Sequence, residues 1–110
     1  MFTPVFQQST IYSLKKSVDY AAGSIVSKIV TKTDAGNITL FAFDQMQNLS
    51  RHSAPYDAIV QVLEGKANII IDDKAFTLSE GEMIIMPANI PHSVDAIEKF
   101  KMMLIMIKGK

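Results

Sequence analysis

The chain contains no cysteine and no tryptophan, and it has only two histidines among its 110 residues. Without cysteine it has no disulfide bond, no thiolate zinc site and no cysteine nucleophile, which fits a reducing compartment. Neither basic nor acidic residues are in excess, because 11 basic residues balance 11 acidic ones. A balanced charge argues against a nucleic-acid-binding protein, which needs clustered lysine and arginine.

Signals for export and for membrane insertion are also missing. Residues 1–10 contain no basic segment followed by an apolar one, as a secretory signal would. The uncharged segment from Met83 to Val94 includes two prolines and is too short to cross a bilayer. We therefore expect a soluble, cytoplasmic protein that binds neither a membrane nor a nucleic acid.

The residues that are present predict short β-strands. Segments rich in apolar and β-branched residues alternate with turn residues, and the length suits one domain. The pattern predicts hairpins at Glu64-Gly65 and at Asp72-Asp73, and one or two helical turns from Tyr12 to Ala22 that end at Gly23. The expected strands are 23–31, 37–44, 58–63, 68–71, 75–78, 83–86, 92–96 and 100–107. Short antiparallel strands at this spacing indicate an all-β sandwich or barrel.

Several of the expected strands are apolar on both faces. Isoleucine occupies 69, 70 and 71 in succession, and Met102 to Ile107 contains no polar residue. A strand buried on both sides needs a second layer outside the barrel. In so small a domain that layer is either a partner subunit, which predicts a homodimer, or the N-terminal arm of the same chain.

Two segments about forty residues apart carry the two histidines. The first runs from Arg51 to Gly65 and contains His52, and the second runs from Gly81 to His92 and contains Pro87. Together they resemble the two sequence motifs of the cupin superfamily. The resemblance implies an all-β fold, the cupin double-stranded β-helix or jelly-roll barrel. It also implies that residues 1–110 form a single cupin domain, with an N-terminal arm at 1–22 and a core at about 37–107.

The resemblance also implies positions for metal ligands, and half of them are altered. Metal-binding cupins hold iron, manganese, nickel, zinc or a similar ion with three histidines and one glutamate. The first and last histidines correspond to His52 and His92, whereas the second falls on Ala54. The glutamate falls on Ala58, or on Ile59 if the spacer is longer. A divalent transition metal would therefore rest on His52 and His92, with help from water or from a residue outside the motif. The alternative is that each histidine is structural and only forms a hydrogen bond with a turn carbonyl.

Other positions of the motifs are also changed. The turn glycine of the second motif is Asn89, a residue that reaches left-handed backbone angles, and the leading glycine of the first motif is Met46. Strand alternation places Asp57 and Gln61 on the face opposite the expected site.

Three functions fit this pattern. The first is the binding of a small molecule inside the barrel, with His52 and His92 as polar handles and with Met46, Tyr56 and Met86 as further lining. The second is a cupin-type metalloenzyme, a dioxygenase or an isomerase, with a reduced metal site at the two histidines. The third is a non-catalytic barrel that serves dimerisation. No catalytic residue, substrate or reaction follows from the sequence.

Overall fold

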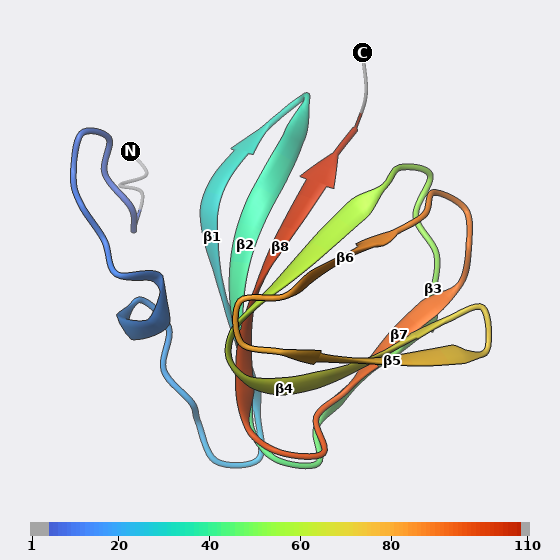
Figure 1. The fold of residues 1–110 in the computed structure, drawn as a ribbon. Helices are drawn as coiled ribbons and strands as arrows, with labels where there is room; N and C mark the ends of the chain where they lie inside the picture. The colour runs from blue at the N-terminus through green and yellow to red at the C-terminus, as the bar shows by residue number, and fades with distance from the viewer. Residues whose placement is uncertain (1–4, 109–110) are drawn as a thin grey trace.

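The structure is a computed structural model that describes residues 5–108. Within these residues one 3-10 turn, η1 (Leu14–Lys16), precedes eight antiparallel strands (Figure 1). Their bounds are β1 (Ile25–Thr33), β2 (Gly36–Phe43), β3 (Asn48–His52), β4 (Ala58–Ile71), β5 (Lys74–Ser79), β6 (Met83–Met86), β7 (His92–Asp95) and β8 (Phe100–Ile107).

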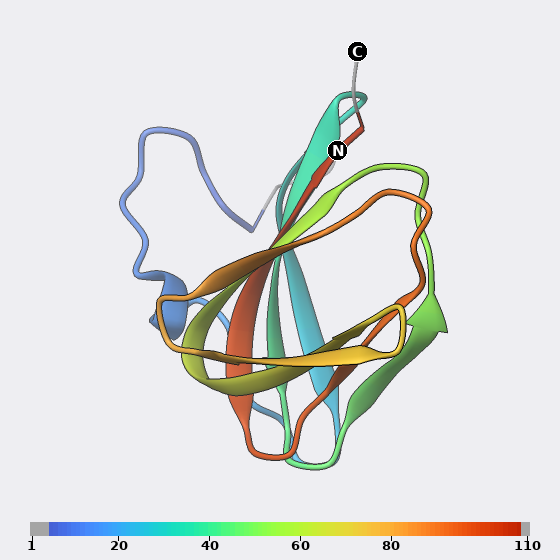
Figure 2. The same ribbon diagram turned by 45° about the vertical axis from the view of Figure 1, so that its right-hand side comes forward.

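The strands form two sheets that share β4. The first sheet has the order β1-β2-β8-β4-β6, and the second has the order β3-β7-β4-β5. Both views show the sheets curling toward each other around a common interior (Figures 1 and 2). The all-β jelly-roll barrel predicted from the motifs is confirmed.

The hairpin predicted at Glu64-Gly65 is wrong, because β4 runs without interruption for 14 residues. Gly65 lies inside the strand, just after a bulge between Val62 and Glu64 in the pairing with β8. Its φ of +78° suits glycine, and a Cβ atom there would overlap the carbonyl oxygen of Lys99. The glycine thus lets β4 bend from one sheet into the other. The turn predicted at Asp72-Asp73 is confirmed, since both residues have positive φ between β4 and β5.

The helix predicted from Tyr12 to Ala22 is reduced to the three residues of η1. The rest of the arm is irregular, and Gly23, at φ +66°, forms the turn that leads into β1. β3 was not predicted, because Asn48–His52 is mostly polar and has no alternating pattern. No helix within residues 5–108 has the length and apolar character needed to cross a bilayer.

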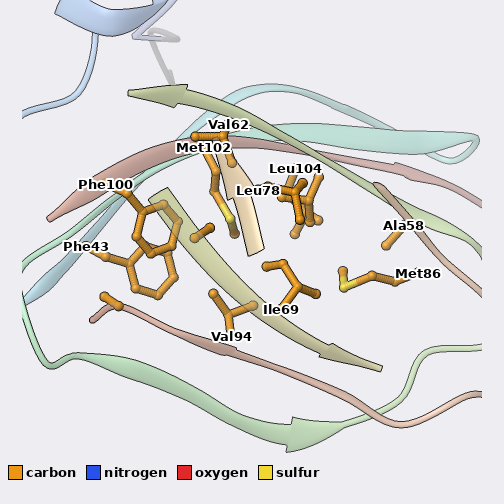
Figure 3. Packing of buried hydrophobic residues seen from close by; sticks show 13 residues of the cluster. Phe43, Ala58, Val62, Ile69, Leu78, Met86, Val94, Phe100, Met102 and Leu104 are labelled. Carbon is orange, nitrogen blue, oxygen red and sulfur yellow. The ribbon is translucent and has the colours of Figure 1, made fainter. Parts of the chain in front are cut away.

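The barrel interior is filled by one apolar cluster, to which every strand of both sheets except β1 and β3 contributes a buried side chain. Phe43 and Phe100 stack at one end, with ring centroids 4.5 Å apart. Figure 3 shows Ala58 and Met86 at the opposite end of the cluster, with Ile69 and Val94 between. The interior is thus a packed core.

A second cluster lies on the outer face of the first sheet, where the N-terminal arm covers it. Val18 of the arm is fully buried against Leu40, Ala42 and Leu63. The Tyr20 hydroxyl donates to Glu64 at 2.6 Å, and the Lys101 ammonium donates to the carbonyl of Lys15. Burial and the hydrogen bond from Tyr20 to Glu64 raise the pKa of that phenol. The arm therefore supplies part of the outer layer that the two-faced apolar strands require.

Candidate functional site

The candidate site lies at the barrel end that carries the loops 53–57 and 87–91. These loops run side by side in both views (Figures 1 and 2). The Asn89 amide donates to the carbonyl of Ala54 at 2.7 Å, and the Ala88 amide donates to the Asp57 carboxylate at 2.9 Å. Asn89 stands where the motif has a turn glycine, and its φ of +65° is the left-handed conformation expected at that position. We call this end of the barrel the mouth.

The two histidines meet at the mouth. His52 ends β3, His92 begins β7, and the two residues are direct partners in the antiparallel ladder. Their ring centroids are 4.5 Å apart and the ring planes are inclined by 68°. His92 also pairs with Ile71 of β4, so the row Ile71–His92–His52 crosses three strands. His92 is 5% exposed, whereas the His52 side chain lies open to solvent.

Backbone carbonyls hold both rings in the same tautomer. Nδ1 of His52 lies 2.8 Å from the carbonyl oxygen of Ser50, and Nδ1 of His92 lies 3.3 Å from that of Ile90. Because a carbonyl oxygen only accepts, each Nδ1 must carry the hydrogen. Each neutral ring therefore has its lone pair on Nε2, which bonds to no group within residues 5–108.

The buried ring is the harder of the two to protonate. Burial lowers the pKa of His92 from its usual 6.5, and the nearby His52 lowers it further, while the bond to Ile90 acts in the opposite direction. Among the described residues no buried side-chain nitrogen lacks a hydrogen-bond partner, so the His92 Nε2, which has none, must reach solvent. At neutral pH the pair therefore presents an accessible acceptor on a neutral His92.

The residues at the mouth do not make a complete metal site. No group of three or more histidine, aspartate or glutamate side chains within residues 5–108 is placed to share an ion. Ala58, at the position of the motif glutamate, is 1% exposed and belongs to the interior cluster, and Ala54 lies in the adjacent loop. Two imidazoles fall short of the three or more protein ligands that zinc sites usually use. The family's metal set therefore does not fit this chain.

Asp57 and Gln61 do not replace the missing ligands, as strand alternation predicts. Asp57 is exposed and engaged with the Ala88 amide, and Gln61 lies on the outer face between Met83 and Met103.

The other predicted lining residues are scattered. Met86 is 3% exposed and packs into the interior cluster beside Ala58, at the mouth end in Figure 3. Tyr56 lies in the loop of the mouth, with its ring centroid 5.9 Å from the Lys108 ammonium. Met46 lies at the opposite end, where its amide donates to Ala96, and it is 73% exposed. The structure thus brings His52, His92, Tyr56 and Met86 to one end of the barrel and leaves Met46 at the other.

The sequence did not identify three groups at the mouth, although it allowed each histidine a bond to a turn carbonyl. They are the carbonyls of Ser50 and Ile90 and the side chain of Ile71. Each carbonyl lies two residues before the histidine whose tautomer it sets, a spacing that is visible in the sequence once the fold is known. Two hollows lie away from the mouth: a groove of about 1140 Å³ between the arm and β1, and one of about 620 Å³ beside β5 and β6.

Comparisons with known proteins agree with this fold. The profile of the cupin domain family matches residues 40–108. A conserved protein of unknown function from Streptococcus pyogenes is 33% identical, with a TM-score of 0.92 over 100% of this chain and 96% of that one. A cupin 2 conserved barrel domain protein from Leptotrichia buccalis is 40% identical, with a TM-score of 0.86 over 88% of this chain. This chain covers 47% of that longer protein.

A cupin superfamily protein from Desulfitobacterium hafniense shares the fold, with a TM-score of 0.88 at 22% identity. No functionally curated protein matches the chain. The profile match covers more than half of the sequence, and it includes both histidines and the paired strands that hold them. The chain belongs to the cupin domain family.

Proposed function

We propose that this cupin binds a small organic molecule at the barrel mouth, through a hydroxyl or amine that donates hydrogen bonds to His52 and His92. The observation that carries the proposal is the shared tautomer, in which both Nδ1–H groups are used by backbone carbonyls. Both Nε2 atoms are then acceptors, so the site favours a ligand that donates. A carboxylate ligand would need at least one ring to be protonated, and burial of His92 opposes that.

Apolar side chains lie next to these acceptors. Ile71 is the ladder partner of His92, and the buried Met86 and Ala58 lie in the interior cluster at the same end. Small-molecule sites typically have such a composition, with a few polar groups among apolar ones. Since fully buried side chains fill the interior, the ligand would rest on the mouth rather than enter the barrel. The proposed site therefore lies nearer the surface than the interior site expected from the sequence, and the proposal keeps His52 and His92 as its polar handles.

The metalloenzyme hypothesis has one observation in its favour. Metal-binding histidines commonly donate from one ring nitrogen to a carbonyl while the other binds the ion, as both rings here could do. The donor set nevertheless lacks a third side chain. We therefore place the metal second, and the experiment below separates the two proposals.

The test is a thermal-shift screen of tag-free protein with matched pairs of fragments, such as a catechol and its dimethyl ether. We expect the hits to be enriched in the donor-bearing member of each pair. Binding should fall at least tenfold in His52→Ala and in His92→Ala. It should persist in Ile97→Ala, a variant of a 68% exposed residue in the turn before β8, at the other end of the barrel.

Two outcomes would overturn the proposal. Hits that bind equally to wild type and to both histidine variants would remove the imidazoles from the site. Near-stoichiometric metal in the purified protein, lost in both histidine variants, would favour the metalloenzyme.

A further inference from the structure

We propose that the free edge of β1 binds an extended acidic segment of another protein, which adds a strand to the first sheet. The segment would lie in the groove between β1 and the N-terminal arm. This groove is outside the barrel, so the inference goes beyond the proposed function and does not depend on the ligand at the mouth.

The edge of β1 that faces away from β2 is open. β1 is the outermost strand on one side of the first sheet, and β2 is its only strand partner within residues 5–108 (Figure 1). On the open edge, N–H and C=O groups of the main chain point outward without a strand to pair with. Extended peptides join sheets at such edges, because the two main chains then form hydrogen bonds with each other.

The groove follows this edge rather than one face of the strand. Its lining includes the six consecutive residues 27–32, and neighbouring residues of a strand point to opposite faces. Six residues of a strand span roughly 20 Å. The groove holds about 1140 Å³, which exceeds the roughly 300–1,000 Å³ of a typical small-molecule site. Its length and volume therefore suit a stretch of extended chain.

A peptide fits the open edge better than an apolar ligand of the same length. An acyl chain laid along residues 27–32 would remove the outward N–H and C=O groups from water and leave them unpaired, which is costly. The main chain of a peptide pairs with these groups instead, while its side chains alternate between the two faces. The open edge thus favours a strand as the occupant.

The opposite wall of the groove is a turn of the arm that its own contacts hold together. The Gln7 amide donates to the Tyr12 hydroxyl at 2.9 Å, and the rings of Phe6 and Tyr12 meet edge to face with centroids 4.9 Å apart. Phe6 and Leu14 anchor the arm on the outer cluster, against which Val30 of β1 also packs. The groove is therefore already formed in the free chain, with apolar side chains on both sides of it.

Two lysines of β1 give the groove a positive charge. Lys28 and Lys32 belong to its lining, and none of its described lining residues is acidic. Neither ammonium group has a hydrogen bond or an ion pair within residues 5–108. Carboxylates on the added strand would supply a partner for each lysine, and this complementarity favours an acidic segment.

The register with β2 places the two lysines on opposite faces. Lys28 pairs with Leu40, whose side chain lies in the outer cluster. Lys32 pairs with Asn37, which is three residues from Leu40 along β2 and therefore on the other face. A bulge in β1 between the two lysines causes this change of face. The matching carboxylates must also lie on opposite faces, so an odd number of positions separates them in the added strand.

The same lysines make a second copy of β1 a poor partner. Pairing of this edge with itself would bring four ammonium groups, two from each copy, onto one pair of strands. Like charges on neighbouring strands repel each other, and lysines on an edge strand oppose its association with identical edges. An acidic strand avoids this repulsion, so the edge selects it over an identical one.

A peptide titration of the full isotope-labelled chain, followed by NMR and calorimetry, tests the proposal. The probe has about nine residues of alternating valine and threonine, with two glutamates three positions apart. One control peptide has lysine in place of both glutamates, and another has proline at its centre, which removes a donor from the added strand. We expect the acidic peptide to protect the amides of residues 27–32 from exchange and to bind at least tenfold more tightly than either control.

Charge reversal in the groove should reverse this preference. Lys28→Glu and Lys32→Glu should each weaken binding of the acidic peptide at least tenfold, and the double variant should prefer the lysine peptide. The matched control is Lys66→Glu, at an exposed lysine of β4 outside the groove, which should bind as wild type does. Circular dichroism establishes that each variant is folded, and the exposed Lys32 carries the test if Lys28→Glu does not fold.

Three outcomes would overturn the proposal. The first is an absence of binding at millimolar peptide, which is also the result expected if a second copy of the chain covers the groove. The second is equal affinity for the acidic, lysine and proline peptides, because neither charge nor strand pairing would then matter. The third is binding that the double variant leaves unchanged or that protects amides outside β1 and the arm.

Discussion

His52 and His92 occupy directly paired positions of two antiparallel strands, with their ring centroids 4.5 Å apart and both Nδ1 atoms bonded to backbone carbonyls. The barrel thus holds two imidazoles in a defined orientation, although the positions of the other family ligands are alanine. The first two predictions below concern this pair and the missing ligands, and the next two concern the backbone of the barrel.

The first prediction concerns pH. Because the pKa of folded His92 is lower than 6.5, its value in the unfolded chain, the unfolded state binds more protons and stability is lost as pH falls from 6.5 toward the folded pKa. The free energy of unfolding should therefore decline more steeply between pH 7 and 5 in wild type than in His92→Gln. In His52→Gln the pKa of His92, followed by NMR, should rise toward 6.5. A wild-type His92 that titrates at or above 6.5 would contradict this account.

The second prediction restores the missing ligands. Ala54→His combined with Ala58→Glu should give tag-free protein that binds cobalt or zinc with one-to-one stoichiometry in calorimetry. Without metal, a glutamate at the fully buried position 58 should lower the free energy of unfolding by about 3 kcal/mol, and metal should recover it. Either single variant should bind at least tenfold more weakly. Equally tight metal binding by wild type would show that ligands at positions 54 and 58 add nothing to the affinity.

The third prediction concerns Met46, which stands where the family motif has glycine. Its φ is +70°, a conformation that costs a non-glycine residue about 1–2 kcal/mol, and little of its side chain is buried. Glycine removes this strain but loses more conformational entropy on folding, which offsets part of the gain. Met46→Gly should therefore raise the free energy of unfolding by about 0.5–1 kcal/mol in urea titrations. Met46→Ala, which keeps the strained backbone, should give no gain. A loss of stability in Met46→Gly would mean that the methionine side chain has a role at this end of the barrel.

The fourth prediction compares two glycines with similar backbone angles. Gly65 has φ +78° and Gly81 has φ +86°, but only at Gly65 would a Cβ atom collide with backbone, at Lys99 and Phe100. Gly81→Ala should cost about 1 kcal/mol, from the backbone conformation alone. Gly65→Ala should cost about 3 kcal/mol or more, since it adds an overlap to the same strain. Equal losses in thermal or urea unfolding would indicate that β4 bends at another residue.

The sequence predicted most of the fold, because the turn residues and β-branched segments act locally. Seven of the eight strands lie where that pattern places them, counting the two expected segments 58–63 and 68–71 as parts of β4. Glu64-Gly65 misled the prediction because a positive φ serves a bend inside a strand as well as a hairpin, and the choice depends on pairing with the distant β8. β3 was missed because its residues are polar and its position is set by β7.

The site was predictable only in part. The motif resemblance assigned His52 and His92 to one site, and the structure makes them partners in adjacent strands. It could not reveal the carbonyls that set the tautomers, which depend on loop conformation. Met46 was expected at the rim of the site. Its positive φ belongs to a turn, and this turn lies at the opposite end of the barrel.

The position of β4 in both sheets has one further consequence. It pairs with β6 and β8 along its first half and with β5 and β7 along its second, so four of the other seven strands depend on it for hydrogen bonds. Neither sheet can separate from the barrel while the other remains intact, and small-scale openings are confined to the arm, the loops and the edge strands. The amide protons of β4 should therefore exchange with solvent only when the whole chain unfolds, and their exchange rates report the global stability directly.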